Sequence, residues 1–185
     1  MAETFLLFKE PQLSSASVIE ERKAVSDVFR KFRETTPLVH CITNYVAMNI
    51  SANVLLAAGG SPAMIHAPEE TADFARIASA LTINIGTLSP PWVEGMKKAI
   101  TAAKNADVPW VFDPVGHFAT PYRAAVAQDI LKMGPTILRG NASEIMALAG
   151  QSSAAKGVDS SDPVEVAEAA ALSLATAHNS VVVIT

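Results

Sequence analysis

Asp113 and the segment 139–144 carry the residue types that could do chemistry in this chain of 185 residues. Each follows an apolar run typical of a β-strand, residues 108–112 before the first and 135–138 before the second. Ligands of an open parallel α/β sheet bind outside the carboxyl ends of its strands. Asp113 and Glu144 are therefore expected to face one crevice, with Arg139 beside them. Two carboxylates and an arginine predict a site for a metal ion and a polyphosphate.

Both acidic positions also have a purely structural interpretation. Asn141 followed three residues later by Glu144 is an ordinary capping box, and the spacing alone does not separate capping from metal binding. Arg139 favours ligand binding, because an arginine at a strand end beside a helix N-terminus can clamp an anion. Asp113 precedes a proline, which taken alone favours a simple turn. Gly116 and the helix start that follows favour a shaped loop instead.

Other candidate residues lie outside these two segments. Asn44, at the start of an expected helix, is well placed for a ligand contact, whereas Met64 taken alone is expected in the core. The four histidines show no spacing typical of zinc ligands. His117 lies in the loop after Asp113, where it could face a ligand, and Cys41 is expected to be a small buried apolar residue.

The elements that must position these residues alternate along the chain. Apolar periodicity and cap signals predict a helix between almost every two strands. The expected strands are 38–42, 63–66, 82–86, 108–113, 135–138 and 181–185, and the expected helices begin at residues 17, 44, 68, 89, 120, 141 and 162. This order predicts an α/β fold with a mostly parallel sheet flanked by helices and right-handed crossovers. We expect a single domain over residues 1–185, opening with a flexible leader of residues 1–16.

Charge, hydropathy and missing motifs argue against several classes of protein. A net charge of −4 is too small to suggest binding to nucleic acid or to a membrane surface, and no apolar run reaches the length of a membrane-spanning helix. One cysteine allows no internal disulfide, so a cytoplasmic protein is the simplest interpretation. Neither the P-loop motif nor the glycine-rich dinucleotide motif occurs, so phosphate chemistry would need another layout.

Five motifs together resemble those of the hydroxyethylthiazole kinase family, which belongs to the ribokinase-like superfamily. They are Pro37-Leu-Val-His-Cys-Ile-Thr-Asn44, Gly60-Ser-Pro-Ala-Met64, Asn84-Ile-Gly-Thr-Leu88, Asp113-Pro-Val-Gly116 with Ala119-Thr-Pro121, and Arg139-Gly-Asn-Ala-Ser-Glu144. The resemblance covers the chain from about residue 22 to its end. It implies a ribokinase-like layered fold. A different small-molecule kinase of the same superfamily is disfavoured by the motifs around Asn44 and Met64.

The resemblance implies ATP-dependent phosphorylation of the hydroxyl of 4-methyl-5-(2-hydroxyethyl)thiazole, in thiamine biosynthesis or salvage. The implied roles are thiazole contacts for Asn44, Met64, Gly86 and Thr87, a Mg²⁺ environment for Asp113 and Glu144, and ATP contacts for Arg139, Asn141 and Thr185. These residue types suit phosphoryl transfer, which needs positioning and charge neutralisation more than covalent chemistry. Family members are trimers with the thiazole site between subunits, so a homotrimer is implied for the full-length protein.

The family pattern continues for several elements beyond Thr185, including a glycine-rich turn that forms an anion hole for the transferred phosphate. We therefore expect the fold to lack its C-terminal elements, with no catalytic residue assigned, and to expose apolar surface or an open edge near residues 181–184. Loss of even one oxyanion donor costs about 10²–10³ in rate, so the chain alone is expected to be inactive. The alternative is a non-catalytic truncated isoform that binds ligand or assembles with full-length subunits.

Overall fold

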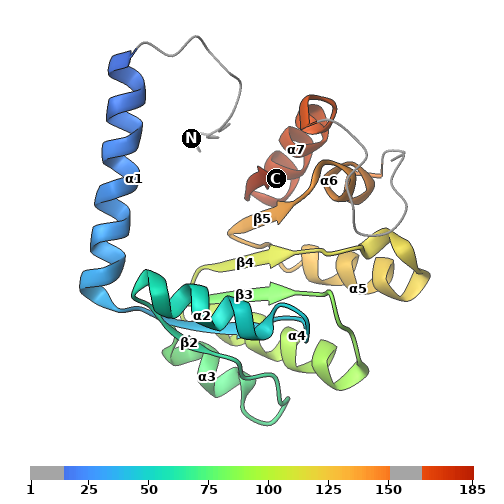
Figure 1. Cartoon of the computed structure of the whole chain (residues 1–185). Helices are drawn as coiled ribbons and strands as arrows, with labels where there is room; N and C mark the ends of the chain where they lie inside the picture. The colour runs from blue at the N-terminus through green and yellow to red at the C-terminus, as the bar shows by residue number, and fades with distance from the viewer. Residues whose placement is uncertain (1–14, 151–163) are drawn as a thin grey trace.

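A computed structural model of the chain describes residues 15–150 and 164–185 (Figure 1). The strands are β1 (Leu38–Ile42), β2 (Ser61–Ala63), β3 (Ala80–Asn84), β4 (Trp110–Asp113), β5 (Ile137–Gly140) and β6 (Val181–Ile184). The helices are α1 (Ser15–Thr35), α2 (Met48–Ala58), α3 (Thr71–Ile77), α4 (Pro90–Asn105), α5 (Pro121–Leu131), α6 (Ala142–Leu148) and α7 (Val164–His178), and a short 3-10 turn, η1, spans His117–Ala119.

The described strands form one sheet in the order β2-β1-β3-β4-β5-β6, and every neighbouring pair is parallel. The predicted α/β fold with a parallel sheet is confirmed. Parallel neighbours must be joined by crossover connections, because a tight turn cannot return the chain to the same end of the sheet. All carboxyl ends of the strands consequently lie along one edge, which is where the candidate residues were expected.

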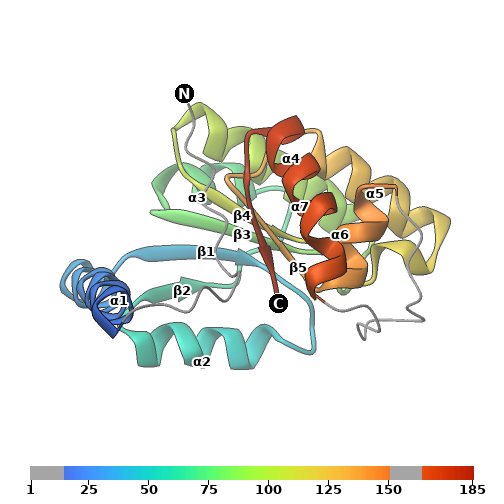
Figure 2. The same cartoon turned by 90° about the horizontal axis from the view of Figure 1, so that it is seen from above.

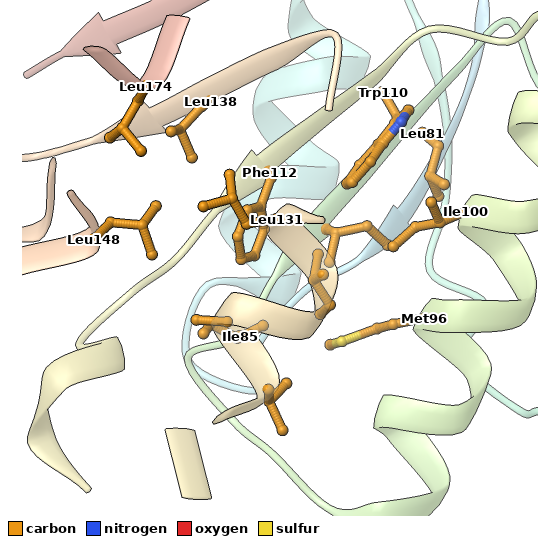
Figure 3. Close-up of a cluster of buried hydrophobic side chains, with 14 of the residues drawn as sticks. Leu81, Ile85, Met96, Ile100, Trp110, Phe112, Leu131, Leu138, Leu148 and Leu174 are labelled. Atoms are coloured by element: carbon orange, nitrogen blue, oxygen red, sulfur yellow. The ribbon is translucent and has the colours of Figure 1, made fainter. Parts of the chain in front are cut away.

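The two faces of the sheet are covered differently. Helices α4 to α7 lie against one face, whereas α2 lies on the opposite side near β1 and β2 (Figure 2). The main core forms between the strands and the first group of helices, where Ile100 of α4, Trp110 and Phe112 of β4 and Leu138 of β5 are buried (Figure 3). Helix α2 has no fully buried residue. The sheet is therefore anchored mainly from one side.

Local signals set several helix starts as predicted. The Ser89 hydroxyl accepts a hydrogen bond from the backbone N–H of Trp92, and the Thr120 hydroxyl accepts one from that of Arg123. Proline follows each cap, where its missing N–H costs nothing. These caps fix the directions in which α4 and α5 leave the carboxyl edge of the sheet.

Some predicted boundaries were wrong. Helix α1 begins at Ser15, so Ser17 lies inside the helix rather than at its cap. The third strand was expected at 82–86, but β3 begins at Ala80, and Leu81 is one of its fully buried residues, because α3 ends at Ile77. Strand β2 is only three residues long, which leaves Met64 directly after it. Residues 1–14 of the expected leader and the helix start expected at Asp162 lie outside the described residues.

Helix α1 stands away from the other helices and contacts them mainly near its C-terminal end (Figure 1). There the Arg33 guanidinium donates hydrogen bonds to the carbonyls of Ala57 and Ala58 at the end of α2. Val25 and Val28 of α1 are 70% and 69% exposed. Among the described residues, no helix is both long enough and apolar enough to cross a membrane.

The one-sided core predicts where the fold is sensitive to mutation. Ile100→Ala, at a fully buried position of α4, should lower the free energy of unfolding by about 2–5 kcal/mol, because it removes packed methyl groups and leaves a cavity. Urea denaturation followed by circular dichroism measures this change. The control is Ile77→Ala, at a position that is 68% exposed, and it should shift stability by less than about 0.5 kcal/mol. Equal losses in the two variants would contradict this view of the core.

Candidate active site

The residues predicted to form a site lie at the carboxyl ends of successive strands. Across the sheet, the residues at or just after these ends are Met64 (β2), Asn44 (β1), Asn84 and Gly86 (β3), Asp113 (β4), Asn141 (β5) and Thr185 (β6). The residues expected to contact the thiazole therefore gather at one end of this row. Those expected to contact ATP gather at the other end, with Asp113 between the two groups.

A chain of side-chain hydrogen bonds joins the middle of this row. The Asn44 amide Nδ2 donates to Asn84 Oδ1 at 2.8 Å, and Asn84 Nδ2 donates to Asp113 Oδ2 at 2.9 Å. Arg139 Nη1 donates to the same carboxylate oxygen at 3.2 Å. Four neighbouring strands thus contribute one polar side chain each to a single connected network.

Asp113 is the electrostatic centre of this network. Its side chain is 18% exposed, and burial raises the pKa of its carboxyl, an effect that the Arg139 charge and the hydrogen bond from Asn84 only partly oppose. Its second oxygen, Oδ1, is buried and has no hydrogen-bond partner. A buried carboxylate oxygen without a partner is costly and is ordinarily satisfied by a donor, a water or a cation. Asp113 therefore carries an unpaired acceptor beside an arginine.

Glu144 has a different environment. Its Oε2 accepts the backbone N–H of Asn141 at 2.9 Å, and Asn141 Oδ1 accepts the N–H of Glu144 at 2.9 Å, which completes the predicted capping box. Its Oε1 accepts the N–H of Gly116 at 2.9 Å. Glu144 is 4% exposed, and burial raises the pKa of its carboxyl despite these bonds. The carboxylate thus ties the loop after β4 to the start of α6.

His117 and Cys41 have structural surroundings. The His117 Nε2 bonds the backbone carbonyl of Glu144 at 2.9 Å, and burial lowers the pKa of the imidazole. Cys41 is buried, as predicted, and burial raises the pKa of its thiol. Neither side chain faces the row of polar residues as a free reactive group.

The switch point of the sheet lies between β1 and β3. The chain leaves β1 towards β2 on one side, whereas from β3 it continues towards β4 on the other. Ligands of open α/β sheets bind at such points. Gly86 lies here against Asn44: a Cβ on Gly86 would come within 2.8 Å of Asn44 Nδ2. The Thr87 hydroxyl accepts the backbone N–H of Tyr45 at 3.3 Å, which holds the two loops together.

Sequence reasoning missed two residues of this site. Asn84 appeared only as part of a motif, although a polar side chain at the end of an apolar strand was a signal for it. Arg123 of α5 donates hydrogen bonds to the carbonyls of Ile85, Gly86 and Val115 at 2.6, 2.5 and 3.1 Å. Its guanidinium fixes the loops after β3 and β4 relative to each other. Nothing in the local sequence indicated that role.

The Asp113 carboxylate suits a hard divalent cation that takes its other oxygen ligands from water or phosphate. Within residues 15–150 and 164–185, no three histidine, cysteine, aspartate or glutamate side chains gather in a way that would enclose a metal ion. Mg²⁺ commonly uses one or two carboxylates and takes its remaining ligands from water and phosphate. Asp113 Oδ1 meets that requirement, because it is an unpaired carboxylate oxygen.

Burial of the Asp113 carboxyl has a measurable consequence for stability. A carboxyl whose pKa is raised on folding destabilises the fold as pH rises through that pKa. Asp113→Asn should therefore increase the free energy of unfolding at pH 7, and the gain should shrink as pH falls towards the ordinary carboxyl pKa near 4. Urea denaturation at several pH values measures both effects.

The matched control for this measurement is Asp129→Asn. Lys97 lowers the pKa of the Asp129 carboxyl through a 2.8 Å ion pair, so its loss should slightly destabilise the fold at pH 7, and that loss should fade in acid. A drop in stability at pH 7 for Asp113→Asn would show that its bonds outweigh the cost of its burial.

Known proteins resemble this chain over most of its length. Residues 29–185 match the family model described as "Hydroxyethylthiazole kinase family". A hydroxyethylthiazole kinase of Gemmatimonas aurantiaca is 57% identical over 172 residues, which are 93% of this chain and 62% of that protein. One of Rhizobium etli is 62% identical over 153 residues, covering 83% of this chain and 59% of that protein.

A solved structure is similar over the same region. The hydroxyethylthiazole kinase protein from Pyrococcus horikoshii OT3 superposes with a TM-score of 0.79 at 41% identity, covering 88% of this chain and 61% of that one. This chain therefore spans about three fifths of the length of these relatives. The match over residues 29–185 and the shared fold show that the chain belongs to the hydroxyethylthiazole kinase family.

Proposed function

We propose that this protein phosphorylates the hydroxyl of 4-methyl-5-(2-hydroxyethyl)thiazole with Mg²⁺ and ATP, as a step of thiamine biosynthesis or salvage. The carrying observation is the connected row of Asn44, Asn84, Asp113 and Arg139, with an unpaired carboxylate oxygen on Asp113. Such a row suits a reaction that joins a neutral alcohol to a polyanion. Family membership supplies the substrate class, since the relatives bear the name of this kinase.

The nucleotide is proposed to bind over β5 and β6. The Arg139 side chain is 48% exposed although it pairs with Asp113, so its guanidinium is accessible to a phosphate. Asn141 caps α6, and Thr185 follows β6 with its backbone N–H bonded to the Gly140 carbonyl at 3.0 Å. An arginine beside these strand ends offsets phosphate charge in a planar, bidentate geometry that lysine lacks.

Mg²⁺ is proposed to bind at Asp113 through Oδ1, with Glu144 in its surroundings. When bound, Mg²⁺ would neutralise phosphate charge and align the transferred group. Because both Glu144 oxygens already accept backbone N–H groups, Glu144 acts chiefly by fixing the Gly116 loop and adding negative charge. Asp113, in contrast, has a carboxylate oxygen, Oδ1, without a hydrogen-bond partner.

The thiazole alcohol is proposed to bind at the switch point between β1 and β3. Asn44 and the loop at Gly86 and Thr87 form one wall, and Met64 after β2 supplies an apolar contact on the other side of β1. Among the described residues these groups bind and orient the alcohol next to Asp113. We assign no general base to them.

A homotrimer is proposed for the full-length protein, with the alcohol site near its interface. Apolar side chains exposed on α2 support an assembly: Ile50 and Val54 are 63% and 61% exposed. The same exposed side chains also support the alternative function, a non-catalytic chain that binds ligand or joins full-length subunits. Val181 and Val183 on the edge strand β6 are likewise 43% and 36% exposed.

The first experiment is thiazole-dependent ADP formation by the purified chain with Mg²⁺ and ATP, beside a version extended to the length of its relatives. Activity in the extended form alone, with ligand binding in both, supports the kinase assignment and the non-catalytic alternative for this chain. Activity in both forms makes this chain an enzyme by itself. Activity in neither form overturns the substrate assignment.

Asp113→Ala in the active form should lower kcat by about 10²-fold or more, because the variant lacks the carboxylate proposed to hold Mg²⁺·ATP.

The close contact at Gly86 gives a test of the alcohol site. Gly86→Ala should weaken binding of the thiazole alcohol by about 10- to 100-fold, because its methyl group would displace the Asn44 side chain. Isothermal titration calorimetry measures the affinity. The control is Gly134→Ala, where the nearest atom is Lys104 Nζ at 4.0 Å and only backbone strain at φ +73° is added. If Gly86→Ala binds like the native chain, the alcohol lies elsewhere.

A further inference from the structure

We infer that Asn84 is a positioning residue that couples the alcohol half of the site to the Mg²⁺·nucleotide half. No role was assigned to it from the sequence, and it lies between residues given to different ligands. The inference deepens the proposed function and rests on it for the identity of the two ligands. The coupling itself follows from the hydrogen bonds of one side chain.

The Asn84 amide is used at both ends. Its Oδ1 accepts from Asn44 Nδ2 at 2.8 Å and from the backbone N–H of Gly86 at 2.9 Å, while its Nδ2 donates to Asp113 Oδ2 at 2.9 Å. The two donors and the carboxylate fix which end of the amide points to each side. A primary amide can accept at one end and donate at the other without carrying charge.

The backbone around Asn84 leaves this side chain little freedom. Asn84 and Asp113 are register partners in the parallel pair of β3 and β4, so their side chains start from neighbouring positions. The next carbonyls along the chain, those of Ile85 and Gly86, are held by the Arg123 guanidinium. A displacement of the Asp113 carboxylate should therefore move the Asn84 side-chain amide, because the backbone of β3 is held in place.

Asn44 is held at its second end as well. Its Oδ1 accepts the backbone N–H of Ala47 at 2.8 Å, which shapes the turn between β1 and α2. The connection thus runs from that turn, through Asn44 and Asn84, to Asp113 and on to Arg139. If a bound cation moves the Asp113 carboxylate, the Asn84 side chain should reorient. The Asn44 side-chain amide, which is bonded to Asn84 and faces the proposed alcohol site, should then reorient as well.

The connection can be tested first without any ligand. In the ¹⁵N-labelled chain, Asp113→Ala should shift the Asn44 side-chain amide signals and the Gly86 backbone amide signal in NMR spectra. In an Asn84→Ala background these shifts should disappear. In a Thr82→Ala background, on the same strand two residues earlier, they should persist. Shifts that survive Asn84→Ala, or that never occur in the native background, overturn the inference.

The functional consequence is tested by calorimetry with two defined probes, the thiazole alcohol and Mg²⁺·ADP. Saturating Mg²⁺·ADP should change the affinity of the native chain for the alcohol by about fivefold or more, as is typical of coupled sites. Asn84→Ala should bring this ratio close to one, whereas Thr82→Ala should retain it. An unchanged ratio in Asn84→Ala refutes the coupling role.

The two tests separate failure of the inference from failure of the proposed function. If the native chain binds neither probe, the proposed function fails for this chain, and the NMR experiment still decides whether Asn84 transmits changes from Asp113 to Asn44. If both probes bind independently of each other in the native chain, the ligand assignment stands and the coupling role of Asn84 is wrong.

Discussion

The site depends on the parallel register of β3, β4 and β5. This register places Asn84 beside Asp113, and the pairing of Phe112 with Leu138 brings Arg139 to the next position along the edge. In an antiparallel sheet the polar ends of neighbouring strands would point to opposite edges, and no such row could form. Buried residues such as Phe112 and Leu138, which hold the strands in register against the helices, are therefore also what aligns the polar row. Packing and chemistry are set by the same constraint.

The one buried charge of the row, the Asp113 carboxylate, is only partly compensated. Asp113 receives hydrogen bonds from a neutral amide and from a guanidinium, yet one of its oxygens remains unsatisfied and its pKa stays raised. Evolution commonly retains such local costs at sites where activity requires an unsatisfied group. An uncompensated acceptor next to an accessible arginine is suited to a ligand that brings a cation and an anion together. This unpaired oxygen is the observation on which the proposed Mg²⁺·phosphate ligand rests.

The sequence predicted the parts of this site that depend on element order. Alternating strands and helices placed Asp113, Arg139 and Glu144 on one edge, because parallel strands must end on the same side. It failed where a contact depends on tertiary distance. Arg123 reaches carbonyls 37 and 38 residues away, and no local pattern encodes such a bond. The start of β3 was expected at residue 82 instead of Ala80, because an apolar residue after a short helix, such as Leu81, fits the helical period as well as the start of a strand.

Glu144 shows why capping and ligand binding could not be separated by spacing. The capping box forms as expected, but the same carboxylate also accepts the N–H of Gly116 from the loop after β4. Gly140 packs closely against this side chain, since a Cβ there would come within 3.2 Å of Glu144 Oε2. The cap is therefore a link between two strand ends and not a local device of α6 alone. Because that link fixes the loop that follows Asp113, Glu144 helps to set the position of the Asp113 carboxylate through backbone contacts alone.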